Sequence, residues 1–93
     1  MTTVWKYPLR LADGVQVLNM PRGARLLSAH DQQGTPTLWM LVDAANPVEE
    51  RRFVVHGTGH PVSLPMDDAF IDFVGSCHDA ARGLVWHVFE VAA

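Results

Sequence analysis

Cysteine is nearly missing from this chain of 93 residues, which contains only Cys77. A single cysteine excludes a disulfide within the chain and a zinc site built from several cysteines, and it suits a reducing compartment. The longest strongly apolar run is Leu38–Val42, whereas a membrane-spanning helix needs about 20 residues. The first residues also lack the basic stretch and the apolar run of a signal peptide. We therefore expect a cytoplasmic protein that makes no membrane contact.

An excess of basic charge is also missing. Seven Lys and Arg residues stand against ten Asp and Glu residues, which gives a net charge of −3. A general nucleic-acid binder usually carries a basic surplus, so that class of protein is disfavoured. A disordered chain is excluded as well, because 48% of the residues are apolar and only 18% are charged. No repeat, linker or low-complexity tract interrupts the sequence, and residues 1–93 are expected to form one domain.

Glycine and proline signals recur at short intervals and separate segments rich in β-branched and aromatic residues. The sequence predicts strands at 3–7, 14–20, 24–32, 37–43, 51–57, 70–78 and 84–91. The segment 64–73 fits either a helical face after Pro65 or a strand, and we expect a short helical turn near 65–70 followed by a strand. The predicted fold is all-β, a curled antiparallel meander or half-barrel of six to seven strands.

The middle of the chain predicts how its strands pair. A turn centred on 33–36 places Trp39 opposite His30, and the next return lays strand 51–57 beside strand 37–43. Both faces of this sheet are then apolar, which is typical of strands in a sandwich, a barrel or an interface. We therefore expect a strongly curled sheet or a partner subunit, and a homo-oligomer.

The last hairpin is predicted from the strands on either side of Arg82-Gly83. Its simplest register sets Gly75 opposite His87 and Ser76 opposite Trp86. Small residues beneath large rings are a common way to pack a strand pair.

Five histidines raise the question of a metal site. The nearest pair, His56 and His60, would share a face only on a helix, and the glycines at 57 and 59 argue against a helix. No third ligand stands at a diagnostic spacing. We expect neither a metal nor a cofactor.

The segment Gly57-Thr58-Gly59-His60 is the clearest candidate for ligand binding. Glycines allow positive φ, so successive N–H groups could converge on an anion, with the Thr58 hydroxyl and the His60 ring as further donors. The alternative is a bulge or turn that ends the strand.

Two guanidinium groups, Arg22 and Arg25, flank a tight turn, and arginine suits phosphate or carboxylate. The alternative is that both are solvated turn charges. Trp86 and His87 offer flat rings on which a base could stack. The expected ligand site therefore combines the 57–60 loop with Arg22, Arg25, Trp86 and His87.

Nucleophilic catalysis has little support in the sequence. No candidate nucleophile sits in a nucleophile elbow, and a buried, structural cysteine is the expected role of Cys77. The candidates are Ser28, Ser63, Ser76 and Cys77. We expect no catalytic residue and no enzyme, although a small hydrolase with His60 or His87 as its base is a third alternative.

Several stretches of the chain resemble a family of small phage and prophage proteins to which no activity is assigned. The most specific are Gly57-Thr58-Gly59-His60 and Trp86-His87-Val88-Phe89-Glu90, and the resemblance covers nearly the whole chain. It implies an accessory phage product that acts against bacterial defence in the host cell cytoplasm.

Two functions are compatible with this resemblance. In the first, the protein sequesters a nucleotide-like immune signal without converting it. In the second, it inhibits a bacterial defence protein, such as a CRISPR complex, by binding it. The ligand-site residues above belong to the first function.

Overall fold

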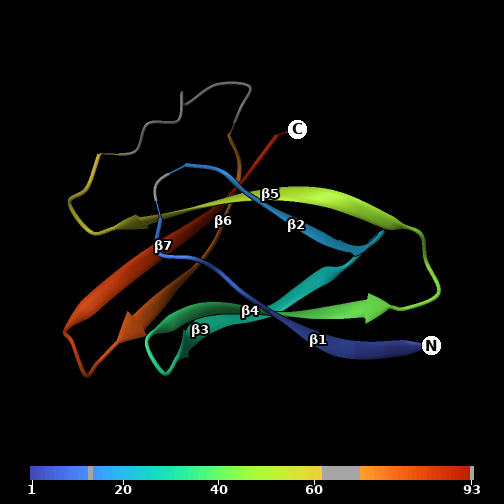
Figure 1. Cartoon of the computed structure of the whole chain (residues 1–93), viewed down its shortest axis with the longest axis horizontal. Coiled ribbons are helices and arrows are strands. Elements are labelled where there is room, and N and C mark those ends of the chain that lie inside the picture. Colours follow the sequence, from blue (N-terminus) through green and yellow to red (C-terminus); the bar gives the residue numbers. More distant parts are fainter. Residues whose placement is uncertain (13, 62–69, 93) are drawn as a thin grey trace.

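The computed structural model describes residues 1–12, 14–61 and 70–92. Seven strands run through this part of the chain (Figure 1): β1 (Thr2–Pro8), β2 (Gln16–Pro21), β3 (Arg25–Gln32), β4 (Thr35–Asp43), β5 (Val48–Gly57), β6 (Phe70–Asp79) and β7 (Leu84–Val91). They confirm the all-β prediction, and each overlaps one predicted strand. The helical turn expected near 65–70 falls on residues 65–69, outside the described ranges, and residue 70 begins β6. The described residues contain no helix able to span a membrane.

The strands form two antiparallel sheets, not one continuous meander. One sheet has the order β1-β4-β3 and the other the order β2-β5-β7-β6. The chain changes sheet three times, from β1 to β2, from β2 to β3 and from β4 to β5, and hydrogen bonds join the last two of these corners. The Arg22 N–H donates to the Pro47 carbonyl at 2.8 Å, and Asn46 Nδ2 donates to the Arg22 carbonyl at 3.0 Å.

The predicted pairing of strand 51–57 with strand 37–43 is therefore wrong. β5 pairs with β2 and β7 instead. The physical reason lies in β4, where Leu38, Met40 and Val42 are at most 1% exposed. A single sheet could not cover this face, and the return of β5 in the opposite sheet buries it against Phe53 and its neighbours in one core.

The two sheets approach most closely where the edge strands β3 and β6 meet. A Cβ placed on Gly75 of β6 would lie only 3.1 Å from the Ala29 Cβ of β3. Small residues at both positions allow the two backbones to come together there. The sheets curl toward each other at this side, but they do not close into a barrel.

The β3–β4 hairpin differs from its predicted register by two residues. Its turn is Gln33-Gly34, both with positive φ, as a two-residue type I′ turn requires. His30 therefore pairs with Thr37, and Trp39 pairs with Ser28. A slip of two residues keeps every side chain on its face, so the His30 and Trp39 rings still contact each other, with centroids 5.2 Å apart.

The β6–β7 hairpin differs from its predicted register by one residue, and this slip has consequences. The turn residues 80–83 lie between Asp79 and Leu84, which pair directly. Ser76 therefore lies opposite His87, and the expected pairing with Trp86 is wrong. A change of register by one residue moves every side chain of one strand to the opposite face relative to the partner strand, so the predicted neighbours across this hairpin do not share a face.

Candidate functional site

The segment 57–60 forms a tight turn at the end of β5. The Thr58 N–H donates to the Val85 carbonyl at 3.3 Å, and the His60 N–H donates to the Gly57 carbonyl at 3.1 Å. Gly59 has a φ of 82°, which fits its place in the turn. Because these two amides are already paired, they cannot converge on an anion. The turn alternative, and not the anion nest, describes this segment.

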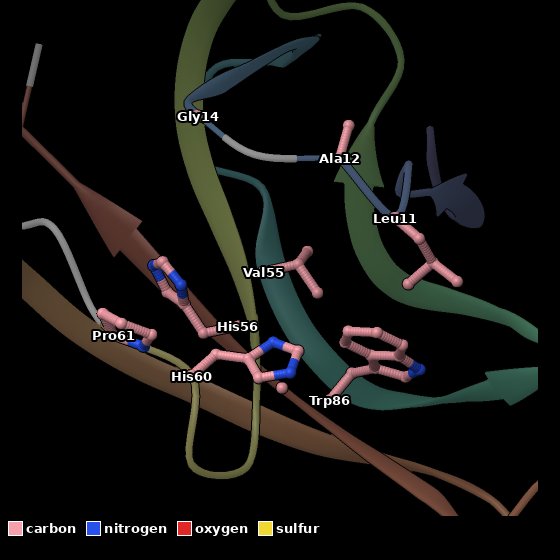
Figure 2. Close-up of a pocket in the computed structure, with 9 residues that line it drawn as sticks. Leu11, Ala12, Gly14, Val55, His56, His60, Pro61 and Trp86 are labelled. Carbon is pink, nitrogen blue, oxygen red and sulfur yellow. The ribbon is translucent and has the colours of Figure 1, made fainter.

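A cavity of about 610 Å³ opens beside this turn (Figure 2). It lies between the loop that joins β1 to β2 and the last residues of β5. Its lining is Leu11, Ala12, Gly14, Val55, His56, Gly57, His60, Pro61 and Trp86. Figure 2 shows Leu11 and Val55 gathered around the Trp86 ring. The described lining contains no Lys, Arg, Asp or Glu.

His60 occupies its position because residue 57 is a glycine. A Cβ on Gly57 would lie 2.8 Å from both Cε1 and Nδ1 of His60, and 3.3 Å from Cζ3 of Trp86. The imidazole therefore rests directly on the β5 backbone. It meets the Trp86 ring edge-on, with centroids 6.3 Å apart. Indole and imidazole together form one wall of the cavity.

Trp86 also carries an unpaired polar atom. Its Nε1–H is buried, and none of the described residues accepts a hydrogen bond from it. A buried donor without an acceptor is unfavourable by about 1–3 kcal/mol. Few buried polar groups in folded proteins lack a partner, so this one calls for a specific explanation.

The His56 side chain lies on the opposite face of the sheet. His56 pairs with His87, its ring is 6.2 Å from the Phe89 ring, and Figure 2 shows it pointing away from Trp86. The sequence pair His56 and His60 is therefore split between two faces. Among the described residues, no group of three His, Cys, Asp or Glu is placed to hold a metal ion.

A second cavity of about 340 Å³ adjoins the first. Gly57, His60 and Trp86 line both cavities. The second is completed by Thr58 and by the first residues of β7, including Leu84 and Val85.

His87 is held between two hydroxyl groups. Its Nε2 lies 2.7 Å from Thr58 Oγ1, and its Nδ1 lies 2.9 Å from Ser76 Oγ. From the sequence, Ser76 is a candidate only as a nucleophile, because the predicted register pairs it with Trp86 and hides its contact with His87. The signal that could have found it was the length of the turn after Asp79, which sets the register of the hairpin.

The two arginines expected at the site lie elsewhere. Arg22 stands at the corner where β2 ends, with Nε 4.0 Å from Glu49 Oε2, and Arg25 opens β3 opposite Leu41. Neither residue lines either cavity. The structure thus gathers Gly57, Thr58, Gly59, His60, Trp86 and His87 and excludes the two guanidinium groups.

The remaining candidate nucleophile on β6 is inaccessible. Cys77 is fully buried, and burial raises the pKa of its thiol. A buried, protonated thiol is a poor nucleophile. Cys77 packs in the core, as the sequence indicated.

The chain matches one family profile over residues 1–93, described as a domain of unknown function, DUF7352. The chain belongs to the DUF7352 family. No curated protein and no solved structure matches it. The description of DUF7352 assigns no activity, so the function of this DUF7352 domain has to be argued from the cavities and their lining.

Proposed function

We propose that the protein binds a small ligand of the nucleotide class through a flat heteroaromatic ring, without converting it chemically. The observation that carries this proposal is the wall formed by His60 and Trp86 in the first cavity. The volume of about 610 Å³ lies in the range of small-molecule sites, which is roughly 300–1,000 Å³. Aromatic and imidazole rings offer faces and edges on which a planar ring packs well.

The lining favours the base of a nucleotide over its phosphate. Aliphatic surface from Leu11 and Val55 faces the rings, and no charged side chain belongs to the described lining. The Trp86 Nε1–H is buried, so the base would pack on the indole ring and would not accept a hydrogen bond from this donor. The phosphate of such a ligand would remain toward solvent.

The proposal includes binding without turnover. The only cysteine is buried, and the Thr58 and Ser76 hydroxyls both contact the same imidazole, outside the wall that would hold the base. The resemblance to phage proteins makes nucleotide immune signals the first ligands to test.

The test is a calorimetric screen of mononucleotides, cyclic di- and trinucleotides and cyclic ADP-ribose isomers, with two matched variants. His60→Ala removes an exposed imidazole beside Trp86, and His30→Ala removes an exposed imidazole beside Trp39 on the other sheet. We expect His60→Ala to weaken binding about tenfold, which is the effect of losing one good contact. His30→Ala should leave the affinity unchanged.

Two results would contradict the proposal. One is the absence of heat with every ligand of the panel. The other is an equal loss of affinity in both histidine variants. If no ligand binds and a bacterial lysate yields one protein partner in stoichiometric amount, inhibition of a defence protein becomes the better account.

A further inference from the structure

The two cavities meet at one side chain, His60, which lines both. Gly57 beneath it and Trp86 beside it also line both cavities. Figure 2 shows the His60 ring standing next to Trp86 at the edge of the first cavity. Ligand groups in the two cavities would therefore both lie beside His60.

The second cavity contains surface suited to a flat group. Leu84 is 39% exposed at the start of β7, and Val85 follows it. Because side chains alternate along a strand, Leu84 and Trp86 lie on one face of β7 and Val85 lies on the other. The volume of about 340 Å³ is smaller than that of the first cavity but still within the range of small-molecule sites.

A fixed hydroxyl group supplies the polar contact in this cavity. Thr58 Oγ1 is bound to His87, and His87 is held from behind by Ser76 Oγ. A hydroxyl has one hydrogen to donate and two lone pairs to accept, so the single bond to His87 leaves Thr58 able to contact a ligand. Because both ring nitrogens of His87 are bound, the hydroxyl is oriented before any ligand arrives.

We infer that the second cavity is a second ring subsite and that the ligand is a dinucleotide, two nucleobases joined through phosphate. This inference rests on the proposed function. One base occupies the first cavity against Trp86, and the other occupies the second cavity against Leu84. The linking phosphate passes His60, whose imidazole can donate a hydrogen bond to it. Once the first base is bound, the second binds as an intramolecular event.

The experiment compares a cyclic dinucleotide with the mononucleotide of the same base by calorimetry. Because the second contact is intramolecular, we expect the dinucleotide to bind the wild-type protein about 100-fold more tightly. Leu84→Trp fills the second cavity from an exposed position. It should reduce dinucleotide affinity to the mononucleotide level and leave mononucleotide affinity unchanged.

Two further variants separate the subsite from general damage. Leu27→Trp enlarges an exposed leucine of β3 that lines neither cavity, and it should change neither affinity. Thr58→Val keeps the shape of the side chain and removes the hydroxyl. It should weaken only the dinucleotide, by about fivefold, as expected for one hydrogen bond.

The outcomes distinguish this inference from the proposed function. If mononucleotides bind and the dinucleotide binds no more tightly, the second subsite is overturned and the first stands. Equal losses for both ligands in Leu84→Trp would also overturn it. If no nucleotide binds the wild-type protein, both proposals fail together.

Discussion

The two ends of β5 close the sandwich in opposite ways. Near its first residues, Arg51 contacts both carboxylate oxygens of Glu90, with two N–O distances of 2.8 Å, and donates to the Ala24 carbonyl at 2.6 Å. Near its last residues, His60 rests on Gly57 beside a cavity, and the Trp86 Nε1–H has no acceptor among the described residues. One end pairs its polar groups, and the other has open volume and a buried donor that no described residue pairs.

This difference indicates how stability and binding are divided in a small sandwich. The Arg51 and Glu90 side chains are only 21% and 16% exposed, so their pairing joins β5, β7 and the β2–β3 corner in a partly dry environment. An unpaired end with open volume adds less to stability, but its ring surfaces line an open cavity. We therefore expect substitutions at the paired end to change stability and those at the cavity end to change affinity.

The largest expected effect is that of Arg51→Met. This change leaves the Glu90 carboxylate and the Ala24 carbonyl without their donor, and it should lower the free energy of unfolding by about 3 kcal/mol. Urea denaturation measures this loss. Ligand affinity of the folded protein should stay at the wild-type value, and a large loss of affinity would contradict the division between the two ends.

A smaller loss of stability is expected for Gly75→Ala. The added Cβ would meet the Ala29 Cβ at 3.1 Å, and neither atom can move without its backbone. Overpacking of this kind costs about 2 kcal/mol, again measured by urea denaturation. A wild-type midpoint for this variant would show that β3 and β6 are not as close as described.

Gly57→Ala is the matched glycine substitution at the cavity end. Its Cβ would lie 2.8 Å from His60, but the exposed imidazole can rotate away. We expect a loss of stability below about 1 kcal/mol and a loss of ligand affinity of about tenfold. If Gly57→Ala lost more stability than Gly75→Ala and kept its ligand affinity, the proposed division between the two ends of β5 would be contradicted.

The smallest effect concerns pH and the β6–β7 turn. The hydrogen bond from the Arg82 side chain lowers the pKa of Asp79, and Arg82 Nη2 also donates to the Gly34 carbonyl at 3.0 Å. A lowered pKa means that the stabilisation is present above the unfolded-state value, about 3.9, and is lost as the pH falls through the folded-state value.

Asp79→Asn tests this linkage. The variant should be less stable than the wild type at neutral pH, and the difference should shrink as the pH falls below about 4. Unfolding curves recorded across this pH range measure it. A difference that stays constant down to low pH would mean that Asp79 acts by shape and not by charge.

The sequence predicted the strands well because glycine and proline signals mark nearly every turn. It predicted the pairing less well, since a strand's partner depends on contacts far apart in the chain. The slip of two residues between β3 and β4 kept Trp39 and His30 on one face. The slip of one residue between β6 and β7 concealed the contact of Ser76 with His87.

The grouping of the candidate-site residues could be predicted from the sequence only in part. Residues 57–60, Trp86 and His87 lie near the ends of strands that do pair, so the structure brings them together. Arg22 and Arg25 stand at the corner where the chain changes sheet. No local sequence pattern shows which sheet each strand joins. The sequence therefore could not predict that Arg22 and Arg25 lie away from the two cavities.

The most direct test of the account uses the three tryptophans of the chain. Each indole N–H gives its own signal in a nitrogen–proton correlation spectrum, and Trp86→Phe assigns the signal of Trp86. Titration with a nucleotide that binds should move the Trp86 signal and leave those of Trp5 and Trp39 in place. Movement of the Trp5 or Trp39 signal with a constant Trp86 signal would place the ligand elsewhere and contradict the account.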